Sequence, residues 1–164
     1  MSSAARGRTR VVLVAALIGL LAGCASPPPA RKPGPAPGVP QRLPELAAFS
    51  ARLDGGSAVP PAASAGQGEL VAVLNRNTGL LQWRLSFSGL SGPVRGGHFH
   101  SPGMAGEVAD PVLSLGRTVL SPSEGRAMLT PRQRASLLAG QWYVNLRTAR
   151  HPEGELRGQL IERR

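Results

Sequence analysis

The chain has few of the residues that build disulfides and most metal centres. Its 164 residues include one Cys and three His. A single cysteine excludes an intramolecular disulfide and any zinc or iron–sulfur site made of several cysteines. Aromatic residues are also scarce, with three Phe, two Trp and one Tyr. They are enough for one modest hydrophobic core.

Long apolar runs and helix-favouring composition are lacking as well. No apolar run reaches the ~20 residues that an ordinary membrane-spanning helix needs. The 21 Gly and 16 Pro are the two residue types least suited to helix interiors, which argues against a helical bundle or coiled coil. The sequence also has no Walker A loop, no dinucleotide-binding glycine loop and no G-x-S-x-G nucleophile elbow. None of the common nucleotide-binding or hydrolase motifs is therefore present.

Acidic residues are in the minority, and the formal net charge is +10. Almost all basic residues are arginines, spread along the chain rather than clustered with aromatic residues as in nucleic-acid-binding proteins. We therefore expect no nucleic-acid partner. The excess of arginine has two alternative explanations. One is a compositional bias without a specific partner, and the other is a basic surface that contacts an anionic polymer.

The first residues have the pattern of a bacterial lipoprotein signal peptide. Arginines precede an apolar stretch from Val11 to Leu21, which is too short to span a bilayer but suits a signal peptide. The stretch ends in Leu-Ala-Gly-Cys at residues 21–24, which resembles a lipobox, and its Cys24 is the only cysteine. We predict a signal peptide over residues 1–23 and lipidation of Cys24. The alternative is a plain secretory peptide with an incidental cysteine.

The next segment, residues 24–47, is predicted to be a tether. It contains prolines from Pro27 to Pro44, so it favours extended polyproline II structure over helix or sheet. The membrane would then be a partner through the lipid on Cys24. No Asp follows Cys24, which favours the outer membrane, facing the periplasm, if the cell is Gram-negative.

Residues 48–164 predict an all-β domain, an antiparallel sandwich or barrel with one short helix. The clearest signal is residues 80–88, where Leu81, Trp83 and Leu85 alternate with polar residues. A helix is expected from Thr130, with Pro131 at its first position, to Gly140. Residues 116–128 are expected to be loop with one strand at most. The other expected strands cover residues 49–53, 69–75, 94–100, 111–115, 142–148 and 154–161.

Six sequence elements follow one another along residues 48–161. They are the opening FSARLDGGSAVPP, the turn at residues 75–79, GLSGP at 89–93, His-Phe-His followed by Pro-Gly at 98–103, Trp-Tyr-Val-Asn at 142–145 and Gly-Glu-Leu-Arg-Gly at 154–158. In this order they resemble the CHRD domain family. The resemblance implies an all-β, extracytoplasmic module with no established catalytic activity.

His98 and His100 are the sharpest candidates for chemistry. Residues two apart on a strand point to the same face, and two imidazoles could hold copper or zinc. Members of the family often carry His where this chain has Arg147, and guanidinium does not ligate metals, which weakens a site of three histidines. His151, four residues further on, is the candidate to substitute as the third ligand. The spacing also resembles a copper–zinc superoxide dismutase element, which makes a dismutase-like enzyme the least favoured alternative. The structural alternative is that both histidines bond to backbone carbonyls or to nearby glutamates.

The resemblance and the strand alternation add further candidate binding residues. Tyr143 faces away from Trp142 and is a candidate for stacking on a sugar. Glu155 and Arg157 share a strand face and predict an ion pair. Asn145 and Arg147 lie in the same motif as Tyr143. We expect a non-catalytic binding or envelope-structural module without a cofactor, whose partner is an envelope protein or an anionic polymer; the alternative is a copper- or zinc-binding protein.

Overall fold

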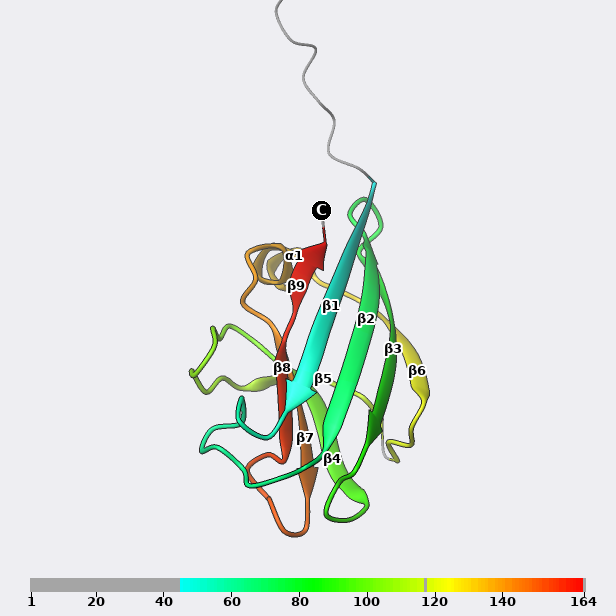
Figure 1. Ribbon diagram of the computed structural model, residues 1–164. Coiled ribbons are helices and arrows are strands. Elements are labelled where there is room, and N and C mark those ends of the chain that lie inside the picture. Colours follow the sequence, from blue (N-terminus) through cyan, green and yellow to red (C-terminus); the bar gives the residue numbers. More distant parts are fainter. Residues whose placement is uncertain (1–44, 117, 164) are drawn as a thin grey trace, which may run out of the picture. The chain divides into compact units, whose positions relative to one another are not determined.

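The computed structural model describes residues 45–116 and 118–163 (Figure 1). The predicted signal peptide, Cys24 and most of the predicted tether lie outside these residues. Within them the chain forms nine strands and one helix, and none of them forms a helix long and apolar enough to cross a membrane. The predicted all-β fold with one short helix is confirmed.

Most elements agree with the strands expected from the alternation of apolar and polar residues. The strand expected over residues 80–88 is β3, with the same bounds, and the strand expected over 94–100 is β4. The elements in chain order are β1 (Leu46–Asp54), β2 (Gln67–Asn75), β3 (Leu80–Ser88), β4 (Val94–His100), β5 (Pro111–Ser114), β6 (Ser123–Met128), α1 (Pro131–Leu138), β7 (Tyr143–Thr148), β8 (Leu156–Gln159) and β9 (Ile161–Arg163).

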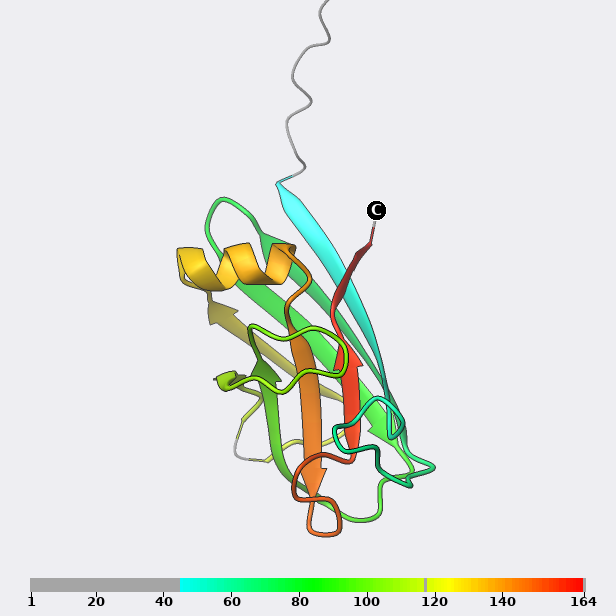
Figure 2. The same ribbon diagram turned by 90° about the vertical axis from the view of Figure 1, so that its left-hand side faces the viewer.

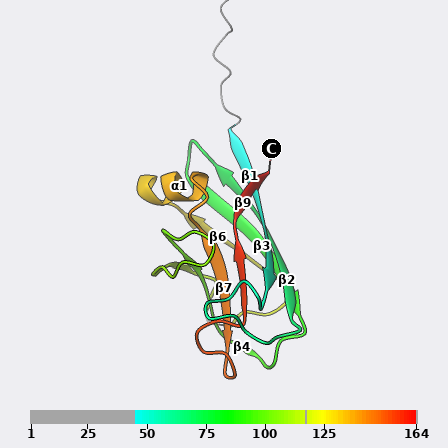
Figure 3. The same cartoon turned by 60° about the vertical axis from the view of Figure 1, so that its left-hand side comes forward.

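All strand pairs are antiparallel, and the strands form a single curled sheet. Its order is β5-β4-β7-β8-β1-β2-β3-β6, with β9 paired to β1 beyond the end of β8. Because the sheet curls, β4 and β7 face β1, β2 and β3 across the core (Figure 3). The two halves are joined where β8 meets β1.

The hydrophobic core fills the space between the two halves of the sheet. Phe99 of β4 lies at its centre, with its ring 5.2 Å from Trp83 of β3 and 5.8 Å from Trp142, which precedes β7. Both tryptophans are buried. Aromatic contacts of this kind add about 1 kcal/mol each beyond the area they bury. The face of each strand that carries apolar residues is therefore the inner face.

The helix begins and ends at the residues that the sequence indicates. Thr130 caps α1: its side chain accepts the N–H of Gln133, and the Gln133 side chain accepts the N–H of Thr130. Gly140 follows the helix with a φ of 74°, a conformation that favours glycine. The one fully buried helix residue is Leu137, which packs α1 onto the core.

The stretch 116–128, expected to be loop with one strand at most, contains β6 among its described residues, and β6 pairs with β3. Two boundaries differ from the predictions. β1 begins at Leu46, so the last two residues of the predicted tether belong to the domain. The prediction of a single closing strand over residues 154–161 is wrong, because this part of the chain forms two strands. Leu160 turns into the core and donates its N–H to the carbonyl of Trp142, so the chain continues as a separate strand, β9, along β1.

Candidate functional site

Most of the sequence-predicted site residues gather on the outer face of β4, β7 and β8; Glu155 and His151 do not. Strand alternation turns Phe99, Val144 and Leu156 into the core and the residues between them outward. Pairing then brings the outward residues side by side, with His98 opposite Asn145 and His100 opposite Tyr143. We call this set the polar face; its members are His98, His100, Tyr143, Asn145, Arg147, Arg157 and Gln159.

The polar face is covered by the segment 101–110, which follows β4. Figure 2 looks onto this face and shows the yellow-green segment passing in front of β7. Its carbonyls accept hydrogen bonds from the polar face: Ala109 from Tyr143 Oη at 3.3 Å, Met104 from Arg157 Nη2 at 2.9 Å and Gly103 from Gln159 Nε2 at 2.9 Å. As a result, polar side chains that would otherwise be exposed are mostly buried.

Tyr143 lies between an imidazole and a guanidinium. The His100 ring stacks on it from β4, with centroids 4.8 Å apart and planes 4° from parallel. Arg157 approaches from β8, on the other side of β7, with its Cζ 3.6 Å from the ring centroid. The Tyr143 ring is only 2% exposed, so it offers no surface platform for a sugar. The stacking role expected from the sequence is wrong, because the side chain is covered by its neighbours.

The two strand histidines lie close together, whereas His151 does not complete a metal site with them. The rings of His98 and His100 have centroids 6.1 Å apart. His100 Nδ1 lies 2.8 Å from the carbonyl oxygen of Ala109, as the structural alternative expects, and its Nε2 is buried without a partner. Within the described ranges no group of three or more His, Cys, Asp or Glu residues could hold a metal ion. The metal prediction therefore depends on His98 and His100 alone.

Burial and nearby positive charge lower the pKa of both imidazoles. Burial, and then the charge of Arg147, lower the pKa of His98. Burial is also the largest effect on the pKa of His100; the bond to Ala109 raises it, but Arg147, His98 and Arg157 lower it, and the net direction is down. The polar face is thus a cationic surface whose charge is carried by Arg147 and Arg157.

Asn145 ties the middle of the polar face to the turn before β8. Asn145 Nδ2 donates to the carbonyl of Glu153 at 2.8 Å, while its Oδ1 is buried without a partner. Arg147 Nε is also buried without a partner. A Cβ at Gly154 would lie 2.3 Å from Asn145 Oδ1, so only glycine fits beside this side chain.

Glu155 does not lie on the polar face. It precedes β8, is fully buried and points to the opposite side from Arg157. Its carboxylate accepts hydrogen bonds from the Ser64 hydroxyl, from the hydroxyl and N–H of Ser91, and from the Thr148 hydroxyl. The predicted Glu155–Arg157 ion pair is wrong, because the strand alternation that it assumes begins only at Leu156. Burial raises the pKa of Glu155, but these four hydrogen bonds outweigh it and hold the pKa at about 2.

Sequence reasoning missed several residues of these clusters. Gln159 could have been found, because it alternates with Arg157 on the same strand. Ser64 and Ser91 could not, because they lie in loops and are separated from Glu155 by 91 and 64 residues. The role of segment 101–110 as a cover also has no local sequence signal.

Comparison with known families agrees with this architecture. The model of the CHRD domain family matches residues 49–160. The chain belongs to the CHRD domain family. Neither the curated proteins nor the solved structures contain a match to it. The CHRD domain runs from Phe49 in β1 to Leu160 after β8, so it includes both the polar face and the Glu155 cluster. The family resemblance inferred from the six sequence elements is confirmed.

Proposed function

We propose that this CHRD protein is a lipid-anchored, extracytoplasmic binding module without catalytic activity of its own. The observation that carries the proposal is the set of buried polar atoms without partners on the polar face: His100 Nε2, Asn145 Oδ1, Arg147 Nε and Gln159 Oε1. A buried polar atom without a partner costs about 1–3 kcal/mol, so folded proteins contain few of them. Several on one face are typical of a surface that completes its hydrogen bonds with another molecule.

The anchoring part of the proposal is supported by the sequence at Cys24. The only cysteine of the chain directly follows an apolar stretch and two small residues, as lipidation requires. Bacterial lipoproteins carry more than one acyl chain, which gives stable membrane attachment, whereas a single chain binds only marginally. We propose the outer membrane, facing the periplasm, as the location in a Gram-negative cell.

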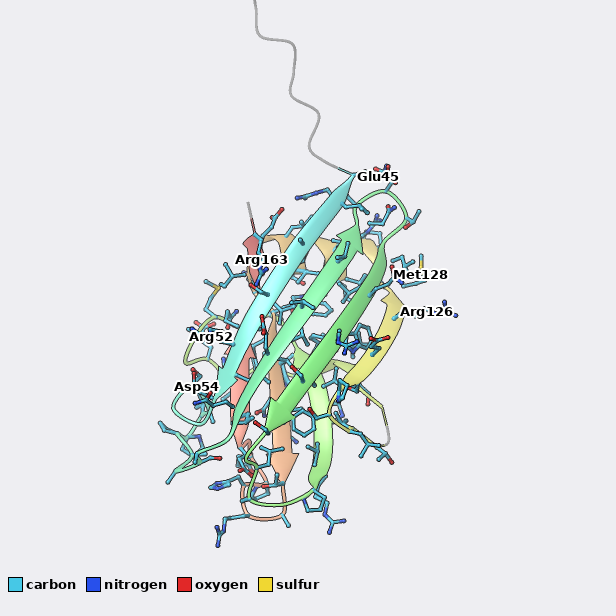
Figure 4. All side chains as sticks on the ribbon, turned by 45° about the vertical axis from the view of Figure 1, so that its right-hand side comes forward. Glu45, Arg52, Asp54, Arg126, Met128 and Arg163 are labelled. Atoms are coloured by element: carbon cyan, nitrogen blue, oxygen red, sulfur yellow. The ribbon has the colours of Figure 1, made fainter. Side chains whose placement is uncertain are left out.

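The favoured partner is an envelope protein that contacts the polar face where it is half-buried, at His98 and Arg147. An anionic polymer would instead use the exposed arginines on the outer face of β1, β9 and β6, where Figure 4 shows Arg52, Arg163 and Arg126. Part of that charge is offset, since Arg163 lies 3.8 Å from Glu69 and Arg84 pairs with Glu124. The polar face has no such internal pairing and is therefore the better candidate.

The anchor is tested by metabolic labelling with radioactive palmitate. We expect the wild-type chain to incorporate label and to sediment with membranes, and Cys24→Ser to do neither. Equal labelling or equal sedimentation of the two chains would refute the anchor.

The binding role is tested by photo-crosslinking in intact cells. A photoreactive residue beside the polar face is expected to capture a defined envelope component in the wild type and in the control variant Arg126→Ala, but not in Arg147→Ala. Capture that is unaffected by Arg147→Ala would show that the polar face is not the binding surface.

The second candidate function, binding of copper or zinc, is supported by His98 beside the free Nε2 of His100. Titration of the metal-free full-length protein with Cu²⁺ and Zn²⁺, beside His98→Ala and His100→Ala, decides it. Stoichiometric binding that both variants lose would establish a metal protein and justify an assay of superoxide dismutation. Binding that is equal in all three chains would refute it.

A further inference from the structure

Arg157 is a buried charge without an ion pair. The residue is 3% exposed, and its guanidinium makes one hydrogen bond, from Nη2 to the carbonyl of Met104 at 2.9 Å. Its other contact is the ring of Tyr143. In the part of the chain that the structure describes, no carboxylate lies within ion-pair distance of it. Buried arginines are almost always paired, so this one lacks a counterion.

The two carboxylates near Arg157 accept hydrogen bonds from backbone N–H groups of their own loops. Asp54, at the end of β1 (Figure 4), is the register partner of Arg157, but its Oδ1 accepts the N–H of Ser57 at 2.7 Å. Glu107 Oε2 accepts the N–H of Met104 at 2.9 Å. Burial lowers the pKa of Arg157 more than Tyr143 and Glu107 raise it. Asp54 and Glu107 therefore stabilise the loops on either side of the guanidinium by accepting backbone hydrogen bonds, and they do not neutralise its charge.

These two loops and β8 enclose a pocket of about 370 Å³. Figures 2 and 3 show the loop after β1 and the segment after β4 on either side of β8. Arg157 is the single charged residue that lines the pocket; the loops contribute only small or apolar residues, from Gly56 to Pro61 and at Ala105 and Gly106. Small-ligand pockets range from ~300 to 1,000 Å³, so this one suits one or two amino-acid residues.

Gln159 lines the same pocket. Its Nε2 donates to the carbonyls of Gly103 and Gly140, and its Oε1 is buried without a partner. Arg157 and Gln159 are two residues apart on β8 and share a face. The wall thus places a cationic donor beside an amide whose oxygen has no hydrogen-bond partner. A molecule that matches both has a carboxylate and, next to it, an N–H group.

We propose that the Arg157 pocket binds the α-carboxylate of a small amino-acid residue, with the adjacent N–H directed to Gln159. The inference rests on the proposed binding function and names the chemical class of the ligand. Two sources carry this chemistry, a free amino acid and the C-terminus of a peptide. Guanidinium pairs with carboxylate through two parallel hydrogen bonds, which a neutral amide cannot replace. The small residues of the loops exclude bulky side chains next to the carboxylate.

The proposal is tested by calorimetric titration of the full-length protein in detergent. The probes are N-acetyl-alanyl-alanine, the same dipeptide with a C-terminal amide, and free alanine. We expect the dipeptide acid to bind at least tenfold more tightly than the amide. Tighter binding of the acid than of free alanine would identify a peptide C-terminus as the source, and the reverse would identify a free amino acid. Equal affinity for acid and amide, or no binding of any probe, would overturn the proposal.

A matched pair of variants tests the location of the site. Ser57 is exposed at the rim of the pocket, so Ser57→Asp and Ser57→Asn have the same shape and differ in charge. We expect Ser57→Asp to weaken binding of the acid about tenfold and Ser57→Asn to leave it unchanged. Arg157→Gln is expected to abolish binding, whereas Arg126→Gln, which removes the same charge from the β6 edge (Figure 4), is not. Equal binding by the two Ser57 variants would place the ligand elsewhere.

The two proposals can fail separately. If a membrane-attached chain captures its envelope component through the polar face but binds none of the probes, the carboxylate pocket is wrong and the binding module stands. If the probes bind with the expected preference while Cys24→Ser leaves membrane attachment unchanged, the pocket stands and the anchor is wrong.

Discussion

The buried carboxylate of Glu155 gives the sharpest stability prediction. Its two oxygens accept hydrogen bonds from Ser64 Oγ at 2.8 Å, Ser91 N at 2.7 Å, Ser91 Oγ at 2.6 Å and Thr148 Oγ1 at 2.5 Å. These partners come from two loops and the end of β7, so the carboxylate ties together one end of the sheet. Glu155→Gln removes the charge and replaces one acceptor oxygen with a donor amide.

The magnitude follows from the pKa of Glu155. The pKa of Glu155 falls from 4.5 to about 2 on folding. Each pKa unit corresponds to about 1.4 kcal/mol, so folding favours the ionised carboxylate by about 3 kcal/mol. We therefore expect Glu155→Gln to lose about 3 kcal/mol of unfolding free energy at pH 7. That is a large part of the ~5–15 kcal/mol that stabilises an ordinary domain. Urea denaturation should show the loss as a midpoint lower by roughly 1–3 M.

The same reasoning predicts how the difference depends on pH. Because the folded pKa lies below the unfolded one, the stabilisation is complete above about pH 4.5 and is lost as the pH falls through about 2. Wild type and Glu155→Gln should therefore differ most at pH 7 and converge towards pH 2. Urea titrations at pH 7, 4 and 2.5 measure this convergence.

Glu124→Gln is the matched control. Glu124 is exposed and pairs with Arg84 on the outer face of the sheet, where an ion pair contributes about 0.5 kcal/mol. Glu124→Gln should therefore lower the unfolding free energy only slightly, at every pH. The reasoning would be refuted by a Glu155→Gln chain as stable as wild type at pH 7, or by a difference that stays constant down to pH 2.

Three further predictions concern packing and capping. Gly158→Ala should cost about 1–3 kcal/mol of unfolding free energy, because its Cβ would lie 2.4 Å from the carbonyl oxygen of Arg52. The control Gly92→Ala, whose Cβ would have nothing within 4 Å, should change the unfolding free energy by less than about 0.5 kcal/mol. Equal losses in the two variants would contradict this. Thr130→Ala should cost about 1 kcal/mol by removing the helix cap, and an unchanged thermal midpoint would argue against the capping box. Phe99→Ala should cost about 3–5 kcal/mol and alter tryptophan fluorescence, and a milder loss would show that the core collapses around the cavity.

Local patterns predicted most of the secondary structure. The alternation in residues 80–88 fixed both the bounds of β3 and its inner face, because a half-buried strand buries every second residue. The capping residues at Thr130 and Gly140 predicted α1 for a similar reason, since the unpaired groups at helix ends need specific partners. Gly79 has a φ of 82°, as the predicted turn requires.

Local patterns failed where the chain leaves regular alternation. Glu155 stands one residue before β8, so the face expected for it was not the face it takes. Leu160 interrupts the closing strand because its inward turn is stabilised by the core and by the carbonyl of Trp142. Both positions depend on contacts with distant residues rather than on neighbours in the sequence.

The candidate site divides in the same way. The sequence by itself determined that His98 and His100 share one face of their strand, because period-two alternation suffices for that. Only the tertiary structure paired β4 with β7 and β7 with β8, which brings Tyr143, Asn145 and Arg157 to the same face. Only the tertiary structure decided that segment 101–110 covers this face and that two loops close a pocket over Arg157. The physical reason is that loops settle where backbone groups find partners, and the partners of these loops lie on strands far along the chain.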